Sequence, residues 1–148
     1  HSRTSLYRLA FSITRNSSDA QEAVAEAVCR AYERYPQLRE KEKLPRWLLK
    51  ITANEARRLC QRRGRTVSWD DLPTEPAIPG RETGDDTLWQ AVQTLPRDQR
   101  EAVVLFYYED LPTEEIARIV GTSPGAVRVR LSRAREKLRS ILKEGDYG

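Results

Sequence analysis

The chain has 148 residues, of which 39% are hydrophobic and 32% are charged, and its formal net charge is +4. Typical globular domains are more apolar and less charged, and the longest apolar run here, residues 102–108, is too short to span a membrane. The only histidine is His1 and there are two cysteines, so the sequence excludes a histidine base, a multi-histidine metal site and a disulfide framework.

Charge is distributed unevenly along the chain and predicts two domains joined by a linker. Residues 1–63 carry a net charge of +7, residues 64–87 carry −4, and residues 88–148 carry +1. The middle segment also contains three prolines and three glycines without helical periodicity, which is typical of an extended linker. A surface loop within a single domain is the alternative interpretation.

The N-terminal segment predicts two helices. Apolar residues at helical spacing predict the first over residues 6–13. The second is expected to begin at Ser18, which can form a capping box with Gln21, and to end before Pro36. Its buried stripe is predicted to comprise Ala20, Val24, Ala27, Val28, Ala31 and Tyr35. Its opposite face is predicted to be acidic and to comprise Glu22, Glu26, Cys29 and Glu33.

A third helix is predicted from Pro45 onward, with one packed side and one side rich in cations and amides. The packed side is predicted to comprise Leu48, Ile51, Thr52, Ala56 and Leu59. The other side comprises Trp47, Lys50, Asn54, Arg57, Arg58 and Gln61. Such a stripe suits single-stranded nucleic acid, because an aromatic ring stacks on bases, amides bind base edges and cations neutralise phosphates. Helical periodicity equally allows Trp47 in the core and a solvated basic face around it.

The C-terminal segment predicts a helix-turn-helix. A fourth helix is expected from Leu88 and a fifth over residues 97–108. A short helix over residues 113–120 is expected to end at Gly121, after which Ser123 caps the longest helix of this segment.

This last helix is strongly basic, with seven Lys or Arg and one acidic residue between residues 121 and 143. At its N-terminal end, Arg128 and Arg133 are placed to contact guanine or phosphates of duplex DNA, and Ala126 or Val129 to contact a thymine methyl group. A solvated basic helix without a DNA partner is the alternative interpretation.

Three motifs, taken in chain order, resemble those of the extracytoplasmic-function class of bacterial RNA polymerase sigma factors, within the sigma-70 family. Residues 19–24 (DAQEAV) and 30–32 (RAY) resemble the core-binding helix of these factors. Residues 44–54 (LPRWLLKITAN) resemble the promoter-melting segment, and residues 111–138 resemble the C-terminal helix-turn-helix. The resemblance spans about residues 5–143.

The resemblance implies an all-α fold made of two small helical domains. A bundle similar to sigma region 2 is expected over residues 1–63 and a helix-turn-helix similar to sigma region 4 over residues 88–148. The segment over residues 64–87 would be the acidic linker between them, containing proline and glycine.

The resemblance also implies a cytoplasmic, non-enzymatic initiation factor with no cofactor, no small-molecule substrate and no membrane insertion. Its partners would be the β′ clamp of core RNA polymerase, promoter DNA and an anti-sigma factor that holds it inactive. Glu22, Glu26 and Cys29 would face the polymerase, and the stripe around Trp47 and Asn54 would capture the non-template strand of the minus-ten element. The minus-thirty-five element would be read by Ser123, Gly125, Ala126, Arg128, Arg130 and Arg133.

Two other function classes remain as alternatives. A helix-turn-helix transcriptional regulator would bind DNA without core polymerase, but such a protein has no need of a basic N-terminal half with an acidic stripe. An enzyme is disfavoured because Cys29 and Cys60 have no histidine partner and the carboxylates show no metal-binding spacing.

Overall fold

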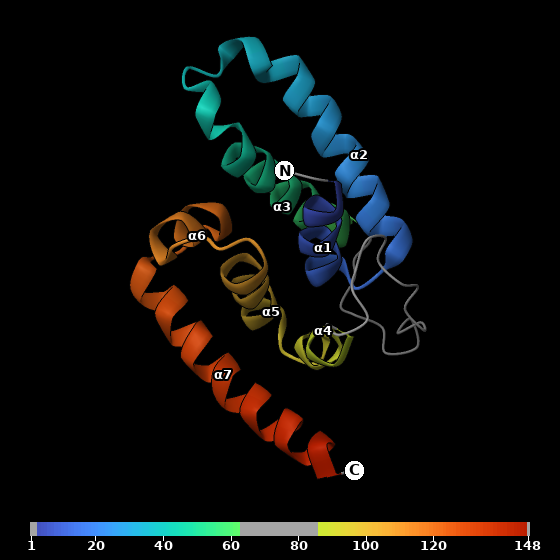
Figure 1. Cartoon of the computed structure of the whole chain (residues 1–148). Coiled ribbons are helices and arrows are strands. Elements are labelled where there is room, and N and C mark those ends of the chain that lie inside the picture. The colour runs from blue at the N-terminus through green and yellow to red at the C-terminus, as the bar shows by residue number, and fades with distance from the viewer. Residues whose placement is uncertain (1–2, 63–85, 148) are drawn as a thin grey trace. The chain divides into compact units, whose positions relative to one another are not determined.

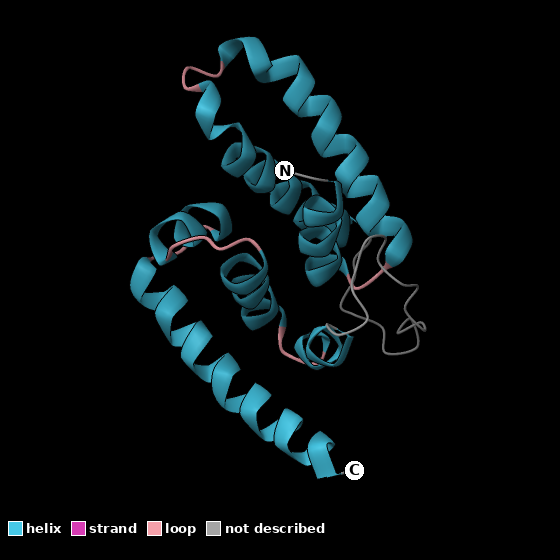
Figure 2. Cartoon of the chain, in the orientation of Figure 1, coloured by secondary structure: helices cyan, strands magenta, loops and turns pink. Residues whose placement is uncertain are grey.

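The computed structural model describes residues 3–62 and 86–147, and every regular element in these ranges is a helix (Figures 1 and 2). The chain divides into two compact units, His1–Ile78 and Pro79–Gly148. The all-α fold class is therefore confirmed. Most of the predicted acidic linker, residues 64–87, lies outside the described residues. Its last two residues, 86 and 87, lie in the first helix described in the second unit.

Over residues 3–62, the N-terminal unit contains three α-helices, each of which packs against the other two. They are α1 (Arg3–Thr14), α2 (Ser17–Arg34) and α3 (Leu44–Arg62), and two short 3-10 turns, η1 (Tyr35–Gln37) and η2 (Lys41–Lys43), connect α2 to α3. Alanines line the contacts between the helices, which lets their backbones approach closely. Completely buried side chains include Leu9, Phe11, Ile13, Ala20, Ala23, Ala27, Leu49, Ala53 and Ala56.

Two predictions for α2 are wrong in detail. The helix is capped by Asn16 and not by Ser18, because Asn16 Oδ1 accepts a hydrogen bond from the Asp19 N–H at 2.9 Å. Val28 and Tyr35 are 48% and 41% exposed, although the predicted stripe included both. Val28 lies about 80° around the helix from Ala20, outside the narrow face that α2 presents to its neighbours.

The described residues of the C-terminal unit, 86–147, form four α-helices and one π-helical turn. They are α4 (Asp86–Gln93), α5 (Arg97–Val103), η5 (Val104–Tyr108), α6 (Thr113–Val120) and α7 (Pro124–Tyr147), and α7 packs against α4, α5 and α6. The core of this unit is built around Trp89, Val92, Leu95, Val103, Leu105, Ile116, Val127, Leu131 and Ala134.

The predicted helix over residues 97–108 changes from α to π at Val104. The Glu109 N–H donates to the Val104 carbonyl at 3.2 Å, one residue beyond the α-helical partner, and Asp110 follows with a φ of 58°. The wider turn leaves Tyr107 46% exposed, while Tyr108 packs edge-on against buried Trp89 with ring centroids 5.5 Å apart. Apolar periodicity identified this helix but gave no sign of the wider turn.

Gly121 ends α6 in the left-handed conformation, with a φ of 79°. A Cβ at this position would meet no atom within 4 Å, so the cost of Gly121→Ala comes from the backbone alone. We expect this substitution to lower the free energy of unfolding of the C-terminal unit by about 1–2 kcal/mol. Urea denaturation followed by circular dichroism measures the change.

Gly125→Ala is the matched control, because Gly125 lies within α7 and its added Cβ would come no closer than 4.0 Å to Ser123 Oγ. Here the substitution should stabilise the unit by up to about 1 kcal/mol. Equal effects of the two substitutions would contradict the role assigned to Gly121.

Candidate nucleic-acid interfaces

The turn between α6 and α7 is fixed by two local signals that the sequence contains. The Gly121 N–H donates to the Ala117 carbonyl at 2.8 Å, which closes the end of α6. Ser123 Oγ accepts a hydrogen bond from the Ala126 N–H at 3.1 Å, which caps α7 as predicted. Helices α6 and α7 pack against each other across this turn, and the arrangement is a helix-turn-helix.

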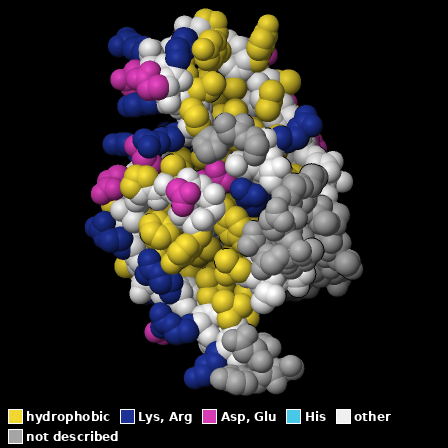
Figure 3. Space-filling view, viewed as in Figure 1, with side chains coloured by type: hydrophobic (Ala, Val, Ile, Leu, Met, Phe, Trp, Pro, Cys, Tyr) yellow, Lys and Arg dark blue, Asp and Glu magenta, His cyan; other side chains and the backbone are white. Residues whose placement is uncertain are grey.

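The buried stripe of α7 determines which of its cations face solvent. Val127, Leu131, Ala134 and Leu138 are all buried, so the remaining faces carry the basic side chains. Figure 3 shows Lys and Arg side chains along α7 with apolar side chains beside them. The N-terminal end of the helix thus presents exposed cations next to a capped helix terminus, the arrangement by which a recognition helix reads a major groove.

The six residues predicted to contact the minus-thirty-five duplex differ in their exposure. Four are exposed: Ser123, Gly125, Arg128 and Arg133. Ala126 is half-buried. Arg130 is also half-buried, and its Nε lies 3.8 Å from Asp98 Oδ2 of α5. Arg128 and Arg133 are therefore better placed to contact DNA than Arg130.

The predicted strand-binding stripe lies on the outer side of α3. Four of its six residues are exposed: Lys50, Asn54, Arg58 and Gln61. The other two, Trp47 and Arg57, are half-buried, and Arg57 Nη1 donates a long hydrogen bond of 3.4 Å to Asn54 Oδ1. Amide and guanidinium groups thus lie together on one accessible face.

Trp47 is neither fully buried nor fully exposed. With Leu48, it packs against the small buried cluster formed by Ala27, Ala31 and Ile51. The burial of Trp47 is thus intermediate between a core position and a fully exposed one, and part of its side chain is accessible.

All four residues of the predicted acidic face of α2 are exposed: Glu22, Glu26, Cys29 and Glu33. Glu26 Oε2 lies 3.5 Å from Arg30 Nε, and Glu22 Oε2 lies 4.0 Å from Arg62 Nη2 of α3. Both are loose pairs of solvent-accessible groups, and such pairs contribute little to stability. The carboxylates therefore remain accessible to a basic partner.

Next to this acidic face, α2 also exposes two apolar side chains. One was predicted to be buried, and the other belonged to neither predicted face. Val28 is 48% exposed and Tyr32 is 84% exposed. An exposed aromatic ring beside carboxylates is typical of protein interfaces, where aromatic residues are enriched. The signal for Tyr32 was present in the sequence, since it lies outside the stripe predicted to be buried.

Glu55 of α3 is a second residue that the sequence prediction did not select. Its side chain is 7% exposed, and its Oε2 lies 2.7 Å from Arg30 Nε and 3.3 Å from Arg58 Nη1. Nothing in the local pattern of α3 indicates this carboxylate, because its closer partner belongs to α2.

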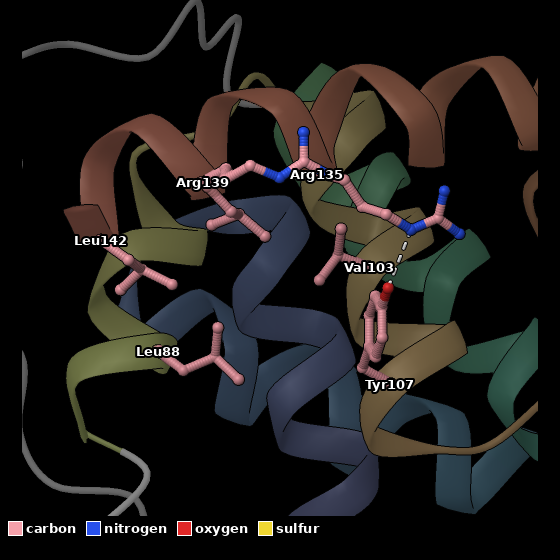
Figure 4. Close-up of a pocket in the computed structure, with 7 residues that line it drawn as sticks. Leu88, Val103, Tyr107, Arg135, Arg139 and Leu142 are labelled. Carbon is pink, nitrogen blue, oxygen red and sulfur yellow. Dashed lines mark hydrogen bonds between the residues drawn. The ribbon is translucent and has the colours of Figure 1, made fainter.

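An apolar groove runs between α7 and the helices beneath it in the C-terminal unit. It is lined by Leu88, Val103, Tyr107, Arg135, Leu138, Arg139 and Leu142. Figure 4 shows leucine and valine side chains lining the groove and the two arginines extending from α7. Arg135 Nε donates a hydrogen bond of 2.9 Å to the Tyr107 hydroxyl, which the π-helical turn directs outward. The sequence pattern gave no sign of this groove.

The described part of the chain contains neither a candidate metal site nor a candidate membrane-spanning helix. Among residues 3–62 and 86–147, no three His, Cys, Asp or Glu side chains are grouped so that they could hold a metal ion. No helix within these same ranges is long and apolar enough to cross a membrane.

Comparison with known proteins gives matches over both units. The family model described as Sigma-70 region 2 matches residues 1–66, and the model described as Sigma-70, region 4 matches residues 85–138. The chain is 32% identical over 142 residues to the RNA polymerase sigma factor SigV of Bacillus subtilis, a match that covers 95% of this chain and 86% of SigV.

A longer relative and a solved structure also match most of the chain. The chain is 33% identical over 147 residues to the ECF RNA polymerase sigma factor SigE of Mycolicibacterium smegmatis, covering 93% of this chain but 57% of that protein. The sigma factor RpoE from Bartonella quintana, solved in complex with the anti-sigma factor NepR, matches with a TM-score of 0.77 and 28% identity. That match covers 93% of this chain and 89% of the RpoE chain.

Proposed function

Because the chain belongs to the extracytoplasmic-function class of sigma factors in the sigma-70 family, we propose that its two units divide promoter opening and promoter reading between them. The N-terminal unit, proposed as residues 1–63, binds core RNA polymerase and captures the melted strand. The C-terminal unit, proposed as residues 88–148, binds the minus-thirty-five duplex. Residues 64–87 link the two.

The observation that carries this proposal is the separation of charge on the N-terminal unit. The exposed carboxylates Glu22, Glu26 and Glu33 lie on α2, and the exposed cations and amides lie on α3. A single unit can therefore offer one face to a basic protein surface and another to nucleic acid, since like charges repel on contact and opposite charges attract. We assign the α2 face, including Cys29, to the β′ clamp of core polymerase.

The α3 stripe is assigned to the non-template strand of the minus-ten element. Unstacking a base costs a few kcal/mol, which contacts on the protein have to recover. Asn54 and Gln61 provide amides for a base edge, and Lys50, Arg57 and Arg58 provide charge for phosphates. The accessible part of Trp47 provides a surface on which a base can stack.

The remaining parts of the proposal concern the second unit and other partners. The N-terminal end of α7, from Ser123 to Arg133, enters the major groove of the minus-thirty-five element. The protein performs no catalytic step itself and acts in the cytoplasm, where the polymerase acts. An anti-sigma factor is proposed as its inhibitor, because the similar RpoE was solved in complex with NepR.

Glu22→Lys is the substitution that tests the polymerase-facing assignment. The Glu22 side chain is 50% exposed and its pair with Arg62 spans 4.0 Å, so reversing its charge should leave the helix folded. We expect affinity for core polymerase to fall about tenfold, which corresponds to about 1.4 kcal/mol. Titration of labelled core polymerase with the full chain measures the affinity.

Glu42→Lys is the matched control, because it reverses an exposed charge in η2 of the same unit but outside α2. Its affinity for core polymerase should remain near that of the unmodified chain. If Glu22→Lys binds core polymerase as well as the control does, the assignment of the α2 face is wrong. If the unmodified chain does not bind core polymerase, the proposed function itself is wrong.

A further inference from the structure

Glu55 is a buried carboxylate that two arginines from different helices share. Arg30 Nε of α2 lies 2.7 Å from Glu55 Oε2, and Arg58 Nη1 of α3 lies 3.3 Å from the same oxygen. The Glu55 side chain is 7% exposed. A charged group this deeply buried requires a close partner of opposite sign.

The two arginines are not equivalent partners. Arg30 is closer to the carboxylate and its side chain is 30% exposed, whereas the Arg58 side chain is 48% exposed. The other acidic group beside Arg30 is Glu26, 3.5 Å away and itself 51% exposed, so its attraction is weakened by solvent. Arg30 is therefore the main counterion of Glu55. Arg58 forms a longer and more solvent-exposed ion pair with the same carboxylate.

We infer that Arg30 is a positioning residue for strand binding, because it neutralises Glu55 and so leaves the charge of Arg58 available to a phosphate of the melted strand. The inference rests on the proposed function, which assigns Arg58 to that strand. Arg30 itself lies on α2 and contacts no nucleic acid in this scheme.

The consequence of removing Arg30 follows from the remaining charges. Glu55 would keep one close cation, Arg58, and the attraction between them would strengthen because the carboxylate is shielded from water. Arg58 would then have to leave a buried anion in order to reach a phosphate. A neutral residue at position 30 should thus weaken strand binding although it removes no strand contact.

The test measures how strongly salt weakens binding of DNA by the holoenzyme. The probe is a forked promoter DNA with a single-stranded non-template overhang, and core polymerase is kept saturating so that reduced core affinity does not contribute. Each phosphate contact on a single strand changes the slope of log K against log salt by about 0.7. Loss of one contact therefore reduces the affinity change between 50 and 200 mM salt by about 2.6-fold.

Four variants separate the roles of these three charged residues. Arg58→Gln and Arg30→Gln should each lower the slope by about 0.7, and the double variant should lower it no further than either alone. Adding Glu55→Gln to Arg30→Gln should restore the slope, because Arg58 then has no anion to hold it. Because removing Glu55 also removes the cost of a buried charge without its partner, thermal unfolding of the same variants separates the two roles: a slope that changes while the melting temperature stays constant does not come from lost folding.

Two controls separate charge from folding and position. Arg30→Lys keeps the cation and should retain the slope of the unmodified protein, even if the helix contact is looser. Arg34→Gln removes an exposed cation one turn further along α2 and should leave the slope unchanged. Thermal unfolding of each variant shows that the three helices remain folded.

The outcomes distinguish this inference from the function on which it rests. If Arg58→Gln lowers the slope and Arg30→Gln does not, the positioning role of Arg30 is overturned and the strand assignment stands. If Arg58→Gln itself has no effect, the assignment of Arg58 to the strand fails and the inference fails with it. An additive effect of the two substitutions would also overturn the inference.

Discussion

Replacing Trp89 by alanine is expected to unfold the C-terminal unit while the N-terminal helices stay folded. Trp89 is 1% exposed, the largest fully buried side chain among the described residues, and Tyr108 packs edge-on against it. Truncating a buried tryptophan costs about 3–5 kcal/mol. A unit of about 60 residues has a total stability of about 3–9 kcal/mol, so this loss removes much or all of it.

Thermal unfolding of the full chain, followed by circular dichroism, measures this effect, and limited proteolysis locates it. Cleavage should increase within residues 86–147 and stay low within residues 3–62. Tyr32→Ala is the control, because Tyr32 is an aromatic residue that is 84% exposed, and its truncation should change stability by less than about 0.5 kcal/mol. Equal sensitivity of both halves of the chain to protease would show that the two units unfold together.

Arg128→Ala is expected to cause the largest loss of promoter binding among substitutions in α7. Arg128 is exposed near the capped N-terminus of this helix, the part that enters the major groove in a helix-turn-helix. A bidentate contact between arginine and guanine contributes about 1–3 kcal/mol of discrimination, so affinity for the correct minus-thirty-five duplex should fall about 5- to 150-fold. Affinity for an altered duplex should fall less.

Holoenzyme binding to matched duplexes, followed by fluorescence anisotropy, gives both affinities. Arg139→Ala is the matched control, because it removes the same charge from an exposed site further along α7. The control should weaken binding slightly and to the same extent for both duplexes. Should Arg128→Ala behave in this same way, Arg128 contacts phosphates only and does not read sequence.

The helices could be predicted from the sequence because their signals are local. Apolar spacing, the capping serine Ser123 and the terminating Gly121 each act within a few residues. Both terminus predictions agree with the structure, and apolar spacing located the helices although it misassigned Val28 and Tyr35. The prediction that Ser18 caps α2 was wrong because Asn16, which can also cap a helix, is the residue that takes extended backbone angles, at φ −144° and ψ 122°.

The other differences between the predicted and the observed structure arise from contacts between residues far apart in the chain. The pairing of Arg130 with Asp98 and of Arg30 with Glu55 depends on how separate helices pack. The same holds for Val28, since its exposure depends on how wide a face of α2 the neighbouring helices cover. Helical periodicity gives the direction of a side chain but not its partner.

The alanine contacts of the N-terminal unit have a consequence for how such a protein diverges. Alanine has no side-chain rotamers with which to absorb a change in its neighbours, and Ala20, Ala23, Ala27, Ala53 and Ala56 are all completely enclosed. Any larger residue there would force the helix axes apart and displace both outer surfaces together. Substitutions are thus better tolerated at the outward positions of α2 and α3, where they leave the packing of the helices unchanged.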